Sequence, residues 1–448
     1  MLEPAYQADV VIVGAGVAGL SAAHRLTSAG VTTTVLEAAP GAGGRMSTEK
    51  VDGFRLDRIG QLLSTAYPEL RLTPGLDALV LRPFAPGVLL HSDGRHHRAG
   101  AVAGAGGARG ALHAVRALAS APRATAAPRA SAPLGNAVDQ ARLGAALTRL
   151  AAMPVERLLS RPESPARQAL AARGVPARTV DGFLRPLLAA LLCDPELTTS
   201  SRCADLALRS FAAGRLCVPE GGAETLPELL RRALPPGTVH TGVRVTSVST
   251  NAVTTAEHGE IRCRAVLLAT DARAAAELLP GLRVPDFHQL TVVHHSADEA
   301  PATGASLLLD ADRGGPVAHT AVVSAVDPSR APAGRVLVSS TVLGPPPADL
   351  DTAVRMHLSR LYGTSTRRWE TLAVHHTAEA VPAMRPPHDL RRPVRLMAGL
   401  YVCGDHRDTS TVQGALHSAH RASTAILADL GAAGSMHRSD PLPTTQAA

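Results

Sequence analysis

Three glycines near the start of the chain have the spacing of a phosphate-binding turn. Gly14, Gly16 and Gly19 follow residues 9–13, a short apolar run rich in valine that predicts a buried parallel strand. In such a turn the first glycine permits a tight bend, the second lets a pyrophosphate approach the backbone, and the third lets a helix and a strand pack closely. The spacing therefore indicates chemistry that depends on a bound nucleotide.

The elements that would position these glycines follow in the right order. The pattern becomes helical from Val17, stops at Gly30, and continues as a second strand over residues 32–36. The first N–H groups of that helix, at Val17 and Ala18, would face phosphate oxygens. Glu37 ends the second strand, ~20 residues after the glycines, where a carboxylate accepts hydrogen bonds from ribose hydroxyls. Together these elements predict a dinucleotide-binding unit.

A second glycine-rich segment is more specific about the dinucleotide. Gly43-Gly44-Arg45, together with residues 47–61, resembles the flavin-dependent amine oxidase superfamily, which includes carotenoid desaturases and protoporphyrinogen oxidase. The resemblance implies that Gly43 and Gly44 let the chain pass close to FAD. It also implies that Arg45 places its guanidinium on the FAD pyrophosphate.

A segment near the C-terminus carries the second half of the same resemblance. Residues 400–403 predict a short strand ending in Gly404-Asp405, and a helix is expected from about residue 411 to 430. In the resembled proteins this aspartate binds the ribityl or pyrophosphate part of FAD, and the helix start faces the flavin pyrimidine. In this sequence the corresponding helix start contains Thr411, Val412 and Gly414. A positive helix end stabilises the negative charge of reduced flavin, and a nicotinamide-only enzyme does not need it, so FAD is the expected cofactor.

The resemblance implies an α/β fold with two interleaved domains. A Rossmann-like FAD-binding domain of the glutathione-reductase type would take residues 1–95, 205–285 and 385–432. A substrate domain of mixed sheet and helices would take residues 96–204 and 286–384, and residues 433–448 are expected to be a disordered tail.

Several weaker patterns fall inside these domains. Residues 238–248 predict one strand, and residues 264–271 predict another. In the resembled proteins a valine of the first of these strands flanks the adenine, and Val245 is the best match to it here. Residues 121–135 predict a loop, and residues 140–215 predict helices. An antiparallel sheet at the floor of the substrate pocket is expected from residues 289–295, 304–310, 317–326 and 334–342.

The residues that amine oxidases use on their substrates are missing from the sequence. Lys50 is the only lysine and lies in the cofactor segment, so the lysine that amine oxidases place near the flavin has no candidate. Tyr401 is the only aromatic residue between residues 371 and 403, and Thr411 stands where an aromatic of the amine cage is expected. These absences favour a desaturase or dehydrogenase with a bulkier, less polar substrate.

Three residues are candidates for a direct catalytic role. His375 and His376 precede residues 380–382, a segment that lies near the flavin in the resembled proteins, so either could accept a proton. The alternative for both is an ordinary core or surface histidine. Gln61 would border the flavin, although Ile59 stands where the family has a glycine and leaves the local register open.

The leading hypothesis is an FAD-dependent oxidoreductase that removes a hydride from a small or medium organic substrate. A flavin amine oxidase that releases imine and hydrogen peroxide is the first alternative. A non-catalytic dinucleotide-binding protein is the second.

Composition excludes several other classes. The 448 residues are 45% hydrophobic and 19% charged, which is typical of a globular protein, and no apolar run reaches the ~18 residues that span a bilayer. Without a leader pattern either, a cytoplasmic protein is expected, with peripheral membrane contact left open. The net charge of +7 comes mostly from scattered arginines, and aromatics are 2%, so nucleic acid is not an expected partner. Five cysteines without metal-like spacing predict a reducing compartment and no metal site.

Overall fold

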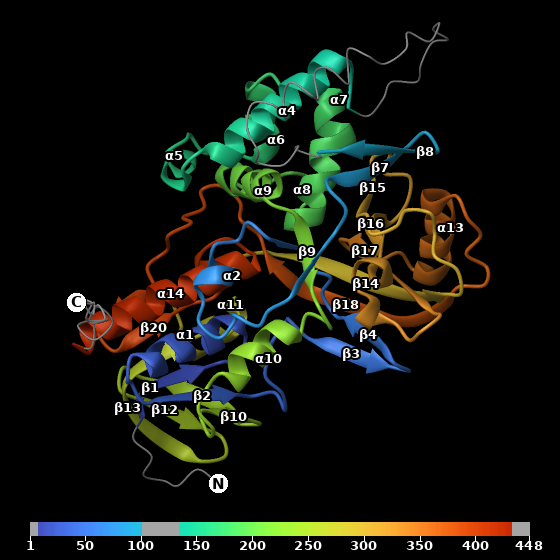
Figure 1. Ribbon diagram of the computed structural model, residues 1–448. Coiled ribbons are helices and arrows are strands. Elements are labelled where there is room, and N and C mark those ends of the chain that lie inside the picture. Colours follow the sequence, from blue (N-terminus) through green and yellow to red (C-terminus); the bar gives the residue numbers. More distant parts are fainter. Residues whose placement is uncertain (1–7, 101–133, 432–448) are drawn as a thin grey trace, which may run out of the picture.

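The computed structural model describes residues 8–100 and 134–431, which are built around two large β-sheets (Figure 1). In Figure 1, blue, yellow-green and red segments from the beginning, middle and end of the chain meet in the unit at the lower left. This unit contains the first sheet. The expected tail at 433–448 and the expected loop over 121–133 lie outside the described residues. The α/β class is confirmed.

The first sheet has a parallel core assembled from three distant parts of the chain. Its parallel strands lie in the order β10 (Val239–Thr241), β2 (Thr33–Glu37), β1 (Ala8–Val13), β13 (Gly259–Leu268) and β20 (Leu400–Val402). One face packs against α1 (Val17–Ser28), α10 (Thr225–Arg232) and α14 (Val412–Asp429). The strands are almost continuously apolar because both faces of the sheet are covered.

A short antiparallel meander covers the other face. It consists of β11 (Val245–Val248), β12 (Ala252–Thr255) and the first half of β13, with α11 (Ala272–Leu278) nearby, and β19 (Arg395–Met397) pairs with β20. The single strand expected over residues 238–248 is therefore wrong. Gly242, with φ of +73°, breaks it into β10, which pairs with β2, and β11, which pairs with β12.

The second sheet has seven strands, and most neighbouring pairs are antiparallel. Its order is β18 (Glu370–Pro382), β14 (Phe287–Ala297), β17 (Val336–Leu343), β16 (Val317–Val322), β15 (Leu308–Asp310), β7 (Val88–Ser92) and β8 (Arg95–Ala99). The expected antiparallel sheet is thus present, except that β15 and β7 run parallel. The strand expected to reach residue 326 ends at Val322 and continues as the short helix α12 (Val323–Val326).

Helices cover the two faces of the second sheet unequally. Helix α13 (Leu350–Tyr362) packs alone on one face, at the right of Figure 1. The other face packs against the helical cluster at the top of Figure 1. This cluster comprises α4 (Ala137–Ala152), α5 (Val155–Leu159), α6 (Ala166–Ala172), α7 (Ala177–Thr179), a π-helical turn (Val180–Leu184), α8 (Arg185–Leu192) and α9 (Ser201–Ala213).

Smaller elements connect the two units. β3 (Thr48–Val51) and β4 (Phe54–Asp57) form a hairpin, and β5 (Leu63–Ser64), β9 (Leu216–Pro219) and β6 (Leu81–Pro83) form a three-stranded sheet next to α2 (Glu69–Leu72). The chain changes unit earlier than expected, because β7 pairs with β15 although residues up to 95 were assigned to the FAD-binding domain. Residues 205–213 were assigned there too, but they belong to α9, which packs against α4. No helix in the described ranges is both long and apolar enough to cross a membrane.

Four buried histidines make the stability of this fold sensitive to acid. Burial lowers the pKa of His294, His295, His319 and His406 from the ordinary 6.5 to about 4. Between about pH 6.5 and 4 the unfolded chain therefore binds protons that the folded chain excludes. We expect the free energy of unfolding, measured by urea denaturation, to be level above pH 6.5 and to fall as the pH is lowered, by at most ~1.4 kcal/mol per pH unit for each histidine. A free energy of unfolding unchanged between pH 6.5 and 5 would contradict this expectation, and His294→Gln should make the slope shallower.

Candidate cofactor and substrate site

The first glycine turn is fixed by the protein's own packing at two of its three glycines. Gly14 has φ of +105°, and a Cβ there would lie 2.9 Å from the Ala269 carbonyl oxygen. A Cβ at Gly19 would lie 2.0 Å from the Gly14 carbonyl oxygen. These two glycines therefore hold α1 tightly against β1 and β13, as the sequence predicts.

Gly16 differs because nothing in the protein requires a glycine there. A Cβ at Gly16 would meet no atom within 4 Å, and Gly16 begins α1 without any side-chain cap. The first N–H groups of a helix have no partner within the helix, so those at Val17 and Ala18 are directed out of its end. The open space and the uncapped helix end fit a pyrophosphate group.

Glu37 organises the turn from the end of β2. One of its carboxylate oxygens accepts a hydrogen bond from the Ala15 N–H (2.8 Å) and the other from the Ala39 N–H (2.9 Å). The Glu37 carbonyl accepts a hydrogen bond from Val243, which is buried. Val245, predicted to flank the adenine, lies two residues further on and starts β11. The roles of Glu37 and Val245 toward FAD remain predictions.

The second glycine segment lies directly against the first. The Gly43 N–H donates to the Ala15 carbonyl (2.9 Å), and Gly43 pairs with Gly16 in an isolated bridge. Gly43 and Gly44 have φ of +128° and +59°, and a Cβ at Gly44 would lie 3.4 Å from the Gly16 Cα. The two motifs therefore meet at the position predicted for the pyrophosphate.

Arg45 joins three separate parts of the chain. One guanidinium nitrogen lies 2.7 Å from a carboxylate oxygen of Asp405, and the other donates to the Ala380 carbonyl on β18 (2.8 Å). The Asp405 side chain is only 7% exposed, against 38% for Arg45. Burial alone would lower the pKa of Arg45, but the charge and the hydrogen bond of Asp405 outweigh it and raise that pKa. Because the Arg45 side chain is partly exposed, an anion such as a pyrophosphate could approach it.

The C-terminal motif has the predicted strand, glycine turn and helix, but the reason for one of its glycines, Gly414, differs from the expected one. Gly404 has φ of +137°, and the Thr411 hydroxyl caps α14 by accepting from the Gly414 N–H (3.1 Å). Next to Thr411, Val412 is the buried first residue of α14. Gly414 was expected to make room for the flavin ring. In the structure a Cβ there would lie 2.0 Å from the Thr409 carbonyl oxygen, so the loop's own backbone already requires this glycine.

The two candidate histidines lie on opposite faces of β18. His375 is mostly buried, with Nε2 3.6 Å from a Glu49 carboxylate oxygen, whereas His376 is exposed and its Nδ1 lies 3.0 Å from the Thr291 hydroxyl. At ~3.3 Å per residue, His375 is ~16 Å along the strand from Ala380, where Arg45 makes its contact. The structure therefore does not bring either histidine to the Arg45 end of the site.

An apolar cluster that sequence reasoning missed lies beside this contact. It consists of Ile59, Leu290, Val292, Ala380 and Val381, packed with partly buried Cys193 and Leu343. Ile59, which stands in place of the family's glycine, is thus a packing residue. Gln61 is half-buried two positions later, and its N–H donates to the Ile59 carbonyl (2.7 Å). Strand patterns predicted the individual apolar residues, but no local signal brings three segments of the chain together.

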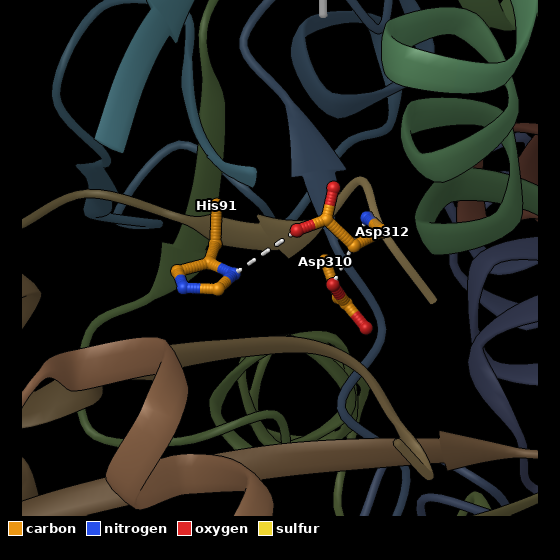
Figure 2. Close-up of side chains that lie close together, drawn as sticks. All are labelled: His91, Asp310 and Asp312. Carbon is orange, nitrogen blue, oxygen red and sulfur yellow. Dashed lines mark hydrogen bonds and ion pairs between the residues drawn. The ribbon is translucent and has the colours of Figure 1, made fainter. Parts of the chain in front are cut away.

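A histidine and two aspartates gather at the far end of the second sheet, and Figure 2 shows them. The His91 ring nitrogen lies 3.9 Å from Asp312, and Asp310 lies beside them. All four aspartate oxygens already accept hydrogen bonds from the chain: those of Asp310 from the N–H groups of Asp312 and Gly314, and those of Asp312 from Ser92 and Asp93. We assign this group to holding the β7–β8 hairpin against the loop after β15.

The arrangement as a whole defines a class of protein. Two glycine segments, Arg45 and the Asp405 loop converge at the carboxyl ends of β1, β13 and β20, which is where open α/β sheets bind dinucleotides. A second sheet then meets this edge through Ala380. This is the architecture of a dinucleotide-binding oxidoreductase with a second sheet attached to the cofactor edge.

The chain belongs to the flavin containing amine oxidoreductase family, whose model matches residues 17–427. It is 43% identical over 108 residues to putrescine oxidase of Kocuria rosea, covering 23% of each chain. It is 51% identical over 49 residues to a carotenoid 3,4-desaturase of Haloarcula japonica, covering 11% of this chain and 10% of that protein. The aligned segments thus span about a quarter or less of these relatives. The expected family and an FAD cofactor are confirmed.

Solved structures show the same fold over most of the chain. Cyclohexylamine oxidase from Brevibacterium oxydans has a TM-score of 0.68 at 17% identity, covering 95% of this chain and all of that one. An oxidoreductase from Methanosarcina mazei has a TM-score of 0.70 at 16% identity, covering 92% of this chain and 99% of that one. Identities this low describe the fold alone.

The contrast between Gly16 and Gly19 gives a test of the phosphate site. Gly16→Ala should leave the thermal midpoint of the apoprotein unchanged, because the new methyl group meets no protein atom. It should weaken FAD binding about tenfold or more, ~1.4 kcal/mol, because the methyl occupies the space for phosphate. Gly19→Ala is the matched control, and it should destabilise the fold itself by ~1–3 kcal/mol or more. Equal FAD affinity of Gly16→Ala and wild type would remove the phosphate assignment.

The Arg45–Asp405 pair gives a second test. Arg45→Ala leaves the buried Asp405 carboxylate without its partner. Because Arg45 is partly exposed, we expect the free energy of unfolding to fall by only ~1–3 kcal/mol. We also expect the variant to lose FAD binding. The Arg45→Ala/Asp405→Asn double variant should recover stability but not FAD binding, as measured by calorimetry and by retained flavin absorbance. Arg45→Lys keeps the charge and should bind FAD with intermediate affinity. Full FAD retention by Arg45→Ala would show that the guanidinium does not contact the cofactor.

Proposed function

We propose that this chain is an FAD-dependent oxidoreductase that removes a hydride from an apolar organic substrate, as a desaturase or dehydrogenase does. The observation that carries the proposal is the apolar cluster around Ile59 and Val292, which adjoins the segment that Arg45 ties to the cofactor site. When bound, FAD supplies a two-electron acceptor for a C–H bond held over its N5. The residues of this chain contribute positioning and exclusion of water, which such a reaction needs more than an acid–base pair.

The residues absent from the site support the same proposal. The lone lysine, Lys50, pairs at the surface with Glu224 (2.9 Å) and is 61% exposed. Tyr401 is buried in the core of the first sheet, where its hydroxyl donates to Asp429. Neither residue is therefore available to hold an amine beside the flavin.

A flavin amine oxidase that releases imine and hydrogen peroxide is the second candidate. It is supported by the family match and by the similarity to putrescine oxidase over 108 residues. Under either candidate we place the protein in the cytoplasm, because all five cysteines are free thiols and three of them are buried. Peripheral membrane contact stays a prediction.

The first experiment is an absorption spectrum of the purified protein followed by acid precipitation. We expect flavin bands near ~450 nm and release of the colour as FAD, because the contacts proposed for Gly16, Arg45 and Asp405 are all non-covalent. A protein that stays colourless after added FAD would contradict the cofactor assignment.

Anaerobic bleaching of the flavin then separates the two candidates. A panel of apolar alcohols and partly unsaturated hydrocarbons should reduce the flavin, whereas putrescine and simple monoamines should not. Reduction by amines with peroxide release in air would favour the amine oxidase and contradict the desaturase or dehydrogenase assignment.

A further inference from the structure

His319 lies on the face of the second sheet that the Gly60 loop covers. On neighbouring strands His319 is directly opposite Thr341, and Thr341 is directly opposite Val292. A Cβ at Gly60 would lie 3.6 Å from the Thr341 hydroxyl and 3.9 Å from a Val292 methyl. Directly opposite side chains of an antiparallel pair stand on one face ~5 Å apart. His319 is therefore one strand beyond the residues that Gly60 covers.

The neighbours of His319 along β16 confirm which face it occupies. Thr320 points the other way, toward α13, where its hydroxyl lies 3.0 Å from the Tyr362 hydroxyl. Ala321, on the same side as His319, belongs to the core shared with the helical cluster. Helix α8 packs on β15 and β16, and Cys193 at its end packs on the apolar cluster beside Gly60. His319 thus lies between the sheet and α8, at the edge of the proposed substrate region.

The imidazole of His319 is buried and, among the described residues, lacks a hydrogen-bond partner at one of its two ring nitrogens. The residue is 6% exposed, and its Nδ1 is buried without a hydrogen-bond partner in the described part of the chain. Burial lowers the pKa of the His319 imidazole to about 4. It is neutral near pH 7 and presents one donor and one acceptor.

Three other histidines of this sheet each face a hydroxyl, carbonyl or carboxylate group, although both ring nitrogens of His295 and the Nε2 of His375 also lack a hydrogen bond within residues 8–100 and 134–431. His294, on the same face, lies 2.8 Å from the Ser339 hydroxyl and 3.0 Å from the Asp57 carbonyl oxygen. His375 faces Glu49. His295, on the opposite face, lies 3.7 Å from Asp351 and packs against Trp369. A buried polar group without a partner is costly, and a ligand that supplies the missing hydrogen bond is one reason for such a group to be present.

We propose that His319 is a substrate-positioning residue whose imidazole hydrogen-bonds an uncharged polar group of the substrate. This inference rests on the proposed function, and it names the substrate class more closely: an otherwise apolar molecule that carries a hydroxyl or carbonyl group. An ammonium group would be disfavoured at this buried point, because a charge taken out of water is costly unless a carboxylate pairs with it, and His319 supplies none. The bound group would be held by the second sheet while the reacting C–H bond lies nearer Gly60.

The test uses the FAD-loaded enzyme and two probes that share one ring, cyclohexanol and cyclohexylamine. Anaerobic titration at pH 7.5 follows the shift of the flavin absorption, which reports binding without turnover. We expect cyclohexanol to bind the wild type more tightly than cyclohexylamine does. His319→Leu should weaken cyclohexanol about tenfold, the effect of one lost hydrogen bond, and His319→Gln should stay within about threefold of wild type.

Two further measurements separate positioning from a structural role. His295→Leu is the matched control, since it replaces a buried histidine on the opposite face of the same sheet, and it should leave cyclohexanol binding unchanged. The thermal midpoint of His319→Leu should equal or exceed that of wild type, because the variant removes a buried polar group without a partner. A histidine with a structural role would instead lower the midpoint. If His319→Leu does not fold, His319→Met takes its place.

Three results would overturn the proposal: cyclohexanol binding His319→Leu as tightly as wild type, cyclohexylamine binding the wild type more tightly than cyclohexanol, or no response of the wild type to cyclohexanol. Failure of the proposed function looks different. A wild type that holds no flavin contradicts the cofactor assignment, whereas a flavin-loaded wild type whose probe binding ignores position 319 contradicts only the role of His319.

Discussion

The contact of Arg45 with both Asp405 and Ala380 is the interaction on which the site depends. It connects the second glycine segment, which contains Arg45, to the loop after β20 and to β18, the edge strand of the second sheet. Because the Asp405 carboxylate is nearly buried, it needs a positive partner, and that partner is held by the glycine segment at the end of β2. One guanidinium therefore fixes the distance between the cofactor unit and the sheet against which the substrate would lie.

The glycines show how similar sequence signals can have different physical causes. Gly14, Gly19 and Gly414 are required by contacts within the protein, since a Cβ at each would collide with a carbonyl oxygen. Gly16 is the exception, because a Cβ there would enter open space. A larger residue at this position would therefore be excluded only by a bound ligand. A motif read from sequence cannot separate these cases, because both give the same letter at the same spacing.

The sequence predicts the cofactor unit well and the substrate unit poorly. The order of strand, glycine turn, helix and acidic residue is local, so α1, β1, β2 and the helix after Asp405 could be placed within a few residues. The single strand expected over residues 238–248 failed because Gly242 turns the chain between two partners that only the folded sheet provides. The alignment of Val292, Thr341 and His319 on three neighbouring strands could not be predicted for the same reason, because the register between distant strands leaves no local pattern in the sequence.

The interleaved topology also has a consequence for how this chain is made. Strand β1 lies between β2 and β13, and β20 joins only after nearly all the other residues have left the ribosome. The phosphate turn is synthesised long before the aspartate that pairs with Arg45. Until β13 has been synthesised, the β1 edge of the early βαβ unit has no partner strand, and an apolar strand with an unpaired edge is prone to aggregation. If Asp405 and Arg45 hold FAD as a pair, the cofactor can be bound completely only after the Asp405 loop has been synthesised and has joined the sheet.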